Sequence, residues 1–318
     1  MIMKNLLCFV VVISFILSSG CFFKDPATYP DTTRLERIPN DITKITPETD
    51  VRPPILHSSE FLEPVPLGGP VNTAGAEDSP FILPDGNTLY FFFTPDVRVP
   101  PEKQLLDEVT GVWVSYKVGK NWSEPERVWL SKPGKLALDG AVCVQDTEMW
   151  FASAREGYTG VNMFTAELVN GEWVNRRYSG DLLMKEYEIG EVHIHGDDLY
   201  FHSSRAGGKG GNDIWVTSRS SGSWSVPVNV EAVNSEHNDG LPFVSSDGHE
   251  LWFTRTYMGT PAVYRSFLTD GGWGEPELIV SQFAGEPTLD DAGNLYFVHH
   301  FFKDNVMLEA DIYVAYRK

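Results

Sequence analysis

The sequence predicts an all-β fold, a five-bladed β-propeller in which each blade is a sheet of four antiparallel strands. Short runs rich in aromatic and β-branched residues recur along the chain, separated by turn-forming sequences. One central aromatic residue recurs at intervals of 51, 51, 49 and 49 residues, at Trp113, Phe164, Trp215, Tyr264 and Tyr313. A single four-stranded sheet cannot bury both of its faces, so units with this period must stack against one another around a ring.

The second and third strands of each unit carry the clearest repeat. The second strand reads LYFFF from Leu89, MWFAS from Met149, LYFHS from Leu199, LWFTR from Leu251 and LYFVH from Leu295. The recurring aromatic residues, from Trp113 to Tyr313, lie in the third strand of each unit. Five such units occupy most of the chain after residue 57, and no long helical periodicity follows the N-terminal leader, so we expect almost no helix.

The fourth strand predicts how the ring closes. The fifth unit stops just after its third strand, at Lys318, so its outer strand is missing from the C-terminal end. The segment 60–67, FLEPVPL after Glu60, is similar to the outer strand of the third unit, SWSVPVNV from Ser223. We therefore expect Phe61 to Leu67 to pair with Asp311 to Tyr316 and to cover two otherwise open strand edges.

Composition limits the classes of partner. The formal net charge is −19, from 44 acidic and 25 basic side chains. Nucleic-acid binding depends on clustered Lys and Arg, so this chain is not expected to bind nucleic acid. The acidic surface is consistent with a solvated exported protein, and also with cation binding.

The N-terminal sequence predicts export and a lipid anchor. Lys4, an apolar run from Leu6 to Leu17 and small residues before Cys21 are typical of a secretory signal peptide over residues 1–20. The sequence Ser-Ser-Gly-Cys resembles a bacterial lipobox, which implies acylation of Cys21, although Ser18 stands where that pattern usually has Leu. An ordinary signal peptide with a chance cysteine is the alternative.

The six prolines within residues 21–56 predict a semi-extended spacer between the membrane and a propeller domain over residues 57–318. With Cys8 in the leader and Cys21 lipidated, Cys143 remains alone. No intramolecular disulfide is then expected, and Cys143 is expected to be a small buried side chain.

Three segments resemble the WD40-like repeat of TolB-type propellers of bacterial envelope proteins. They are PFILPDGNTLYF from Pro80, SSRAGGKGGNDIW from Ser203 and PFVSSDGHELWF from Pro242. The resemblance spans residues 57–318 and implies a location in the cell envelope and the binding of a partner. Two arginines in matching places, Arg155 and Arg205, are expected to form ion pairs between blades.

Carboxylates recur at the start of the first strand of every unit. They are Glu77, Asp78, Asp139, Glu188, Glu191, Asp239 and Glu286. First strands line the channel of a propeller, so we expect these acids to converge at one mouth. Crowded carboxylates raise one another's pKa or hold a cation.

Three interpretations of these acids stay open. In the first, the acids cap strands or pair with arginines. In the second, their oxygens bind a hard cation, for which Ca²⁺ is suited. In the third, they hydrolyse glycosides. Five-bladed glycosidases of the arabinanase and β-xylosidase type place an Asp base, an orienting Asp and a Glu acid on the first strands of blades 1, 2 and 3. Asp78, Asp139 and Glu188 are similar in order and position, which implies those roles if the chain is a hydrolase.

The sequence therefore predicts a membrane-anchored envelope lipoprotein, periplasmic or at the cell surface, whose propeller binds a protein or glycan. Glycoside hydrolysis is the alternative. The histidines do not predict a zinc site, because a lone pair such as His299 and His300 lacks the third ligand that zinc requires.

Overall fold

The computed structural model describes residues 28–318 of the chain. The predicted signal peptide and Cys21 lie outside these residues. Within residues 28–318 the fold is all-β, and the helices are single turns: α1 (Arg34–Arg37), α2 (Pro101–Gln104) and the π-helix η1 (Leu182–Glu186). None of the helices in this range is long and apolar enough to cross a lipid bilayer.

Antiparallel pairing divides most of the strands into successive groups along the chain, and a parallel pairing of β24 with β3 joins the last group to the first in one nine-stranded sheet. The first comprises β3 (Ala76–Ile82), β4 (Thr88–Thr94), β5 (Gly111–Val118), β6 (Asn121–Trp122) and β7 (Glu126–Arg127). The second comprises β8 (Ala137–Gln145), β9 (Glu148–Arg155), β10 (Asn162–Val169) and β11 (Glu172–Tyr178). The third comprises β12 (Val192–His195), β13 (Asp198–Ser203), β14 (Asp213–Ser220), β15 (Ser223–Trp224) and β16 (Val228–Asn229).

The remaining strands form the C-terminal part of the fold and its N-terminal additions. The fourth group comprises β17 (Asp239–Val244), β18 (Glu250–Tyr257), β19 (Thr260–Thr269), β20 (Gly272–Trp273) and β21 (Glu277–Ser281). The fifth comprises β22 (Ala284–Leu289), β23 (Leu295–Lys303) and β24 (Val306–Ala315). Two short strands precede all of these, β1 (Ile55–Leu56) and β2 (Val65–Pro66).

The repeated aromatics explain the common register of these groups. In each group the Phe of the second strand lies directly opposite the recurring aromatic of the third strand. The cross-strand pairs are Phe91 with Trp113, Phe151 with Phe164, Phe201 with Trp215, Phe253 with Tyr264 and Phe297 with Tyr313. All ten side chains are buried. Facing aromatic pairs stabilise antiparallel sheets, and a slip of one residue would turn these rings to the opposite face.

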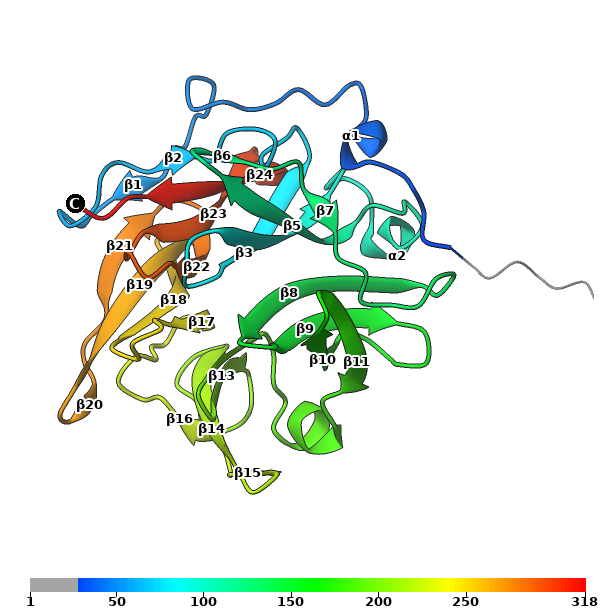
Figure 1. Cartoon of the computed structure of the whole chain (residues 1–318). Helices are drawn as coiled ribbons and strands as arrows, with labels where there is room; N and C mark the ends of the chain where they lie inside the picture. The colour runs from blue at the N-terminus through cyan, green and yellow to red at the C-terminus, as the bar shows by residue number, and fades with distance from the viewer. Residues whose placement is uncertain (1–27) are drawn as a thin grey trace, which may run out of the picture.

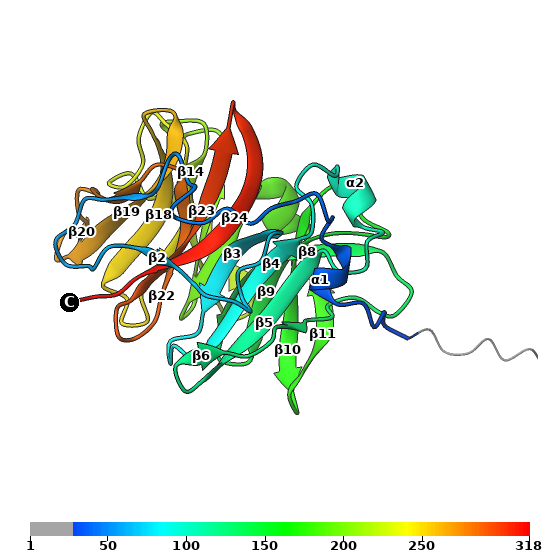
Figure 2. The same cartoon turned by 90° about the horizontal axis from the view of Figure 1, so that it is seen from above.

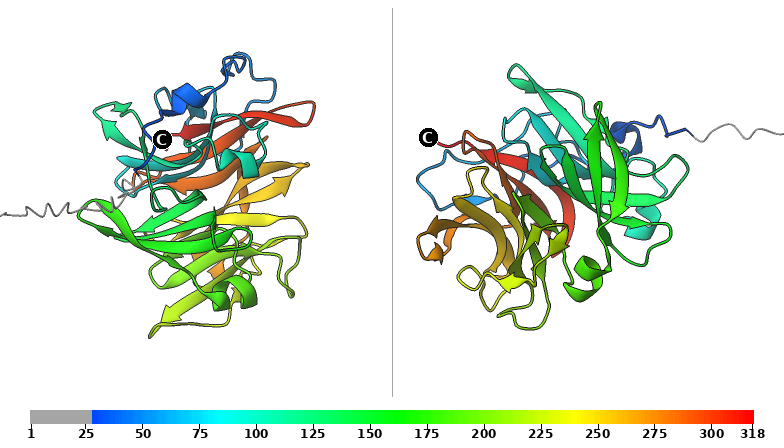
Figure 3. Two further views of the ribbon diagram at one scale, coloured as in Figure 1. Left: turned by 90° about the vertical axis from the view of Figure 1, so that its right-hand side faces the viewer. Right: turned by 60° about the horizontal axis from the view of Figure 1, so that its bottom comes forward.

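The first strands contact one another in a cycle. β3 contacts β8, β8 contacts β12, β12 contacts β17, β17 contacts β22, and β22 contacts β3 again. Figure 1 shows the same order, with the chain passing around the molecule from cyan through green and yellow until the red β24 lies beside β2 and β3. The views in Figure 3 show the sheets side by side around this circuit.

The predicted pairing of the segment 61–67 with the C-terminal strand is confirmed. β2 pairs with β24 in antiparallel register, Val65 opposite Val314 and Pro66 opposite Tyr313. The backbone N–H of Leu62 donates to the carbonyl of Tyr316 at 2.8 Å. The side chain of Phe61 is 1% exposed and contacts the Trp252 ring edge-on, with ring centroids 6.1 Å apart.

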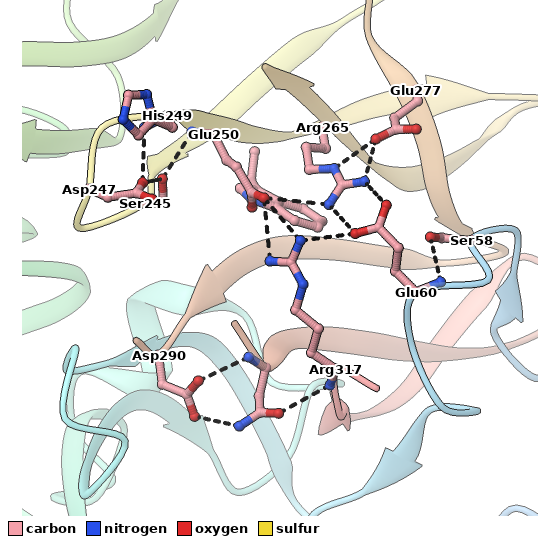
Figure 4. Close-up of polar contacts among 12 residues, drawn as sticks. Ser58, Glu60, Ser245, Asp247, His249, Glu250, Arg265, Glu277, Asp290 and Arg317 are labelled. Carbon is pink, nitrogen blue, oxygen red and sulfur yellow. Dashed lines mark hydrogen bonds and ion pairs between the residues drawn. The ribbon is translucent and has the colours of Figure 1, made fainter. Parts of the chain in front are cut away.

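An ion-pair network holds the closing segment to its neighbours (Figure 4). The fully buried Arg265 on β19 donates to Glu60 at 2.6 Å and to Glu277 at 2.5 Å. Arg317, beyond β24, donates to the same Glu60 at 2.9 Å and lies 3.4 Å from Glu250. The network therefore joins the closing segment to the fourth group and to the C-terminus.

Residues 28–56 make contacts that their composition did not predict. β1 pairs with β21, adding a strand to the fourth group. Arg34 is 2% exposed and its guanidinium lies 3.0 Å from the carboxylate of Glu77. Lys44 pairs with Glu309 and Asp311, and Asp50 is 2.9 Å from the imidazole of His299. In Figure 2 this blue segment crosses the sheets beside the red β24. Much of the predicted spacer thus lies against the folded domain.

Candidate functional site

The site begins with a bulge that recurs in the first strands. The pairing register shifts between Asp78 and Phe81 and, at matching places, in β8, β17 and β22. The residue in each bulge has a positive φ: Ser79, Ala141, Leu241 and Glu286, at 46°, 46°, 54° and 55°. A bulge inserts an extra residue and redirects its side chain. Here the bulge residues all line one central cavity.

This central cavity is small. Ser79, Ala141, Glu191, Leu241 and Glu286 contribute to its lining, and its volume is about 50 Å³. A water molecule takes roughly 30 Å³ in the liquid, and pockets for small organic ligands are about 300–1,000 Å³. The cavity therefore has room for an ion, one or two waters or the tip of a side chain, and not for a sugar ring.

Three of the predicted mouth acids each lie two positions before the bulge residue of their strand and are buried in ion pairs. Glu77, Asp139 and Asp239 are each 0–1% exposed. Asp139 accepts hydrogen bonds from Arg155 and Ser153, both at 2.6 Å. Asp239 accepts from Arg255 at 2.5 Å and from the backbone and hydroxyl of Ser235. These carboxylates connect strands and loops and are not free for a ligand.

The arginines of these pairs, and Arg205 at the matching place in the third group, stack on the repeated aromatics. Arg34 lies over Trp113, Arg155 over Phe164, Arg205 over Trp215 and Arg255 over Tyr264, at 4.2–5.6 Å from the ring centroids. The prediction of ion pairs between blades is wrong for Arg155, because its partner Asp139 lies in the same sheet. Among residues 28–318, Arg205 forms no ion pair within 4.0 Å. In the third group, Ile189 stands at the position that corresponds to Asp139 of the second group. The acid that would pair with Arg205 is therefore missing.

The other carboxylates meet at the channel. Glu191 and Glu286 line the cavity, and Asp78 and Glu286 have carboxylate oxygens within 4.8 Å of one another and of a His300 ring nitrogen. His300 Nε2 is 3.6 Å from Asp78 Oδ2. The backbone N–H of Ser79, at the bulge, donates to Asp78 Oδ1 at 2.8 Å. Glu286 Oε2 is buried with no hydrogen-bond partner in the described part of the chain. We call Asp78, Glu191, Glu286 and His300 the mouth cluster.

Burial and mutual repulsion shape the protonation of the mouth cluster. Burial, aided by the charge of Asp78, raises the pKa of Glu191 to about 7. Burial, followed by the charges of Asp78 and Glu191, raises the pKa of Glu286 well above its ordinary value. For Asp78, burial is the largest influence and opposes ionisation, but the charge of His300 and hydrogen bonding to His300, Ser79 and Glu286 together lower the pKa of Asp78. The cluster thus contains one ionised carboxylate beside two that retain protons more readily.

The residues implied for a hydrolase are not brought together. Asp78 belongs to the mouth cluster, but Asp139 is held by Arg155 and Ser153. Glu188 is exposed and precedes β12 in a left-handed conformation, with φ 54°. The arrangement of Asp78, Asp139 and Glu188 inferred from the resemblance therefore does not form one catalytic pocket.

Two clefts adjoin the mouth. One is polar and uncharged apart from Asp239 and His202, and is lined by residues that include Asn212, Asn238 and Thr254. The other runs past His300 and is lined by Arg52, Met258, Phe283, Phe302 and Met307. Phe283 and Phe302 stack with ring centroids 4.7 Å apart, and the side chain of Met258 is 87% exposed. The mouth is therefore flanked by surfaces that could contact a larger ligand.

His300 is the site residue that sequence reasoning did not assign. It lies on β23, a second strand, whereas Asp78 and Glu286 lie on first strands of different groups. The histidine pair in the sequence lacked a third ligand, and the structure supplies carboxylates instead. No local motif signals this, because β3 and β23 become neighbours only when the ring closes.

No family model matches the chain, and no curated protein matches it in sequence. Solved structures that are similar to it include TolB from Acinetobacter baumannii, at 12% identity and a TM-score of 0.44, over 78% of this chain and 56% of that one. A GH43 glycoside hydrolase engineered to have endo-xylanase and exo-arabinofuranosidase activity matches at 16% identity and a TM-score of 0.44, over 79% and 51% of the two chains.

A gluconolactonase from Xanthomonas campestris matches at 12% identity and a TM-score of 0.48, over 84% of this chain and 95% of that one. Both resemblances noted in the sequence, to TolB and to arabinanase-type glycosidases, thus recur among similar structures. The chain aligns with only about half of the length of the TolB and GH43 proteins.

Proposed function

We propose that this chain is an exported, lipid-anchored five-bladed β-propeller that binds a protein or glycan partner at the mouth of its central channel. The cyclic contacts of the first strands support the count of five blades, with the β2–β24 pairing as the closing element. The predicted leader and the lipobox-like sequence at Cys21 support export and anchoring.

One observation supports the mouth of the channel as the binding surface. The fold neutralises Glu77, Asp139 and Asp239 with arginines, whereas among the described residues no Lys or Arg lies within 4.0 Å of the Asp78 or Glu286 carboxylates. Carboxylates whose pKa values are perturbed by burial and by one another are typical of functional sites. The aromatic and methionine-lined cleft beside His300 would add apolar contact area.

Glycoside hydrolysis is the second candidate, with a changed set of residues. Asp78 has a lowered pKa, while the pKa values of Glu191 and Glu286 are raised, and a carboxylate beside a protonated carboxyl suits base and acid roles. The small central cavity weighs against it, because a sugar would have to sit outside the cavity in the adjoining clefts.

The binding surface is tested by site-specific photocrosslinking in cells. A photoreactive amino acid at Met258, beside the mouth, should crosslink a partner, whereas the same amino acid at Val169, on the exposed β10–β11 hairpin, should not. Asp78→Asn should reduce the Met258 crosslink at least tenfold, and Glu188→Gln, in an exposed acid outside the cluster, should leave it unchanged. Equal crosslinking from both positions would refute the proposed surface.

Glycans and hydrolysis are tested in parallel with the purified full-length protein. A glycan array and a panel of aryl-glycosides should show binding or turnover that is lost in Asp78→Asn. Turnover abolished by that change would establish the hydrolase alternative, and binding without turnover would establish a glycan-binding protein.

Anchoring is tested with Cys21→Ala. The unmodified chain should fractionate with membranes, and the variant should move to the soluble fraction because it cannot be acylated there. If both fractionate alike, lipid attachment at Cys21 is wrong, whatever the mouth binds.

A further inference from the structure

The geometry points to a transition-metal site of zinc type, formed by Asp78, Glu286 and His300 at the mouth of the channel. The inference rests on the proposed use of the mouth as a ligand site, and it specifies the first ligand held there. The three residues come from β3, β22 and β23, so the site exists only where the first and last strand groups of the ring meet.

The separation of the ligand atoms fits a shared metal ion. His300 Nε2 and Asp78 Oδ2 are 3.6 Å apart, which is too long for a hydrogen bond between them. Two ligand atoms that each lie about 2.0–2.2 Å from a tetrahedral Zn²⁺ are roughly 3.3–3.6 Å from one another. All three residues offer a ligand atom within 4.8 Å of the others, so a small adjustment would bring them to one ion.

The carboxylate oxygens that accept no hydrogen bond also support a metal site. Asp78 Oδ1 is occupied by the backbone N–H of Ser79, which leaves Oδ2 facing His300. Glu286 Oε2 is buried without a hydrogen-bond partner in residues 28–318, and such an oxygen is compensated either by a proton, which the raised pKa of Glu286 allows, or by a bound cation. The backbone N–H of Glu286 donates to Thr254 Oγ1 at 2.8 Å, which fixes the backbone of the bulge from which this side chain extends.

The ligand types decide the class of metal. Ca²⁺ prefers six to eight oxygen ligands, as expected for a ring of carboxylates alone. An imidazole nitrogen with two carboxylates suits Zn²⁺ and related ions better. Two carboxylates also balance the charge of a divalent ion. The proposed site thus contains a nitrogen ligand, and it differs from the all-oxygen Ca²⁺ site that was one of the three open interpretations of the sequence.

Three protein ligands leave at least one coordination position for water or an outside donor. His300 and Asp78 have side chains that are 16% and 25% exposed, so this position would be reached from the mouth. A carboxylate or hydroxyl of the partner could then complete the coordination sphere.

The test is a metal titration of the untagged full-length protein after removal of metals with a chelator. Competition against a chromophoric zinc chelator should show one Zn²⁺ per chain, with Ca²⁺ at least 100-fold weaker. His300→Ala should lower the Zn²⁺ affinity at least tenfold, and Glu286→Gln should do the same. The matched control is His249→Ala, because His249 is exposed and lies outside the mouth cluster.

The inference of a zinc-type site is wrong if no Zn²⁺ binds, or if Ca²⁺ binds as tightly as Zn²⁺. It is also wrong if His300→Ala and Glu286→Gln bind Zn²⁺ as tightly as the His249→Ala control does. Thermal unfolding of each variant without metal establishes that the loss is not caused by misfolding. The titration contains no partner, so its failure leaves the partner-binding proposal to the photocrosslinking test.

Discussion

Two sets of carboxylates begin the first strands of this fold, and they have opposite surroundings. Glu77, Asp139 and Asp239 are buried beside arginines that stack on aromatic rings. The second set, Asp78, Glu191 and Glu286, lies at or beside the bulge of the strand and faces the channel and His300.

This difference shows that a shift of one position along a strand changes the surroundings of a carboxylate completely. Successive side chains of a strand point to opposite faces, and a bulge adds a further change of direction. Glu77 and Asp78 are adjacent, yet Glu77 accepts hydrogen bonds from Arg34 and Thr73, while Asp78 lies near His300. The first set is therefore neutralised by arginines, whereas among residues 28–318 no Lys or Arg lies within 4.0 Å of the Asp78 or Glu286 carboxylates.

The largest expected effect comes from breaking a pair of the first set. Arg255→Met keeps much of the side-chain volume but leaves Asp239 buried without its cation. Removing one partner of a buried ion pair costs roughly 3–5 kcal/mol, and the two hydrogen bonds from Ser235 should hold the loss to about 3 kcal/mol. Chemical denaturation measures the free energy of unfolding. A loss below about 1 kcal/mol, as for ordinary surface substitutions, would contradict the structural role assigned to this pair.

Arg34→Met should destabilise the protein by less, about 2 kcal/mol near pH 6, and by more at higher pH. Burial raises the pKa of Glu77 to about 7, although Arg34 lowers it, so without Arg34 the pKa should rise further and Glu77 can take a proton. The folded state then binds more protons than the unfolded state, so stability is retained at low pH and declines as the pH rises.

The free energy of unfolding of Arg34→Met should decline by up to about 1.4 kcal/mol per pH unit between the pKa of Glu77 in the unfolded state and its pKa in the folded state. Unfolding curves of Arg34→Met and of the unmodified chain at pH 6, 7 and 8 measure it. A difference between the two proteins that does not change with pH would show that Arg34 acts through packing on Phe93 and Trp113 rather than through the charge of Glu77.

The smallest effect on stability is expected for Asp78→Asn, which should change the free energy of unfolding by less than about 1 kcal/mol. The amide keeps an oxygen for the backbone N–H of Ser79 and removes a charge that repels Glu191 and Glu286. The same denaturation assay measures this. A loss as large as that of Arg255→Met would place Asp78 with the structural acids and remove the distinction between the two sets.

Much of the fold could be predicted from local patterns. The repeated LYF-type cores predicted the second strands, and the spacing of Trp113, Phe164 and their equivalents predicted the third strands and their facing aromatic pairs. The missing outer strand at the C-terminus predicted that Val65 and Pro66 would pair with β24. The packing of residues 28–56 was not predicted, because a proline-rich composition does not reveal that Arg34 and Lys44 find buried acids far along the chain.

The sequence alone determined the repeated strands, their pairing within each group and the pairing of Val65 and Pro66 with the last strand, because period, hydrophobic alternation and turn residues recur from unit to unit. It also placed the acids at the starts of the first strands. Only the tertiary structure decided which of those acids receive an arginine and which meet His300, because bulge geometry and ring closure bring together β3, β22 and β23 from opposite ends of the chain. The energetic reason is burial: a carboxylate in the interior must find a cation, a hydrogen-bond donor or a proton, and the arrangement of the sheets determines which of these is within reach.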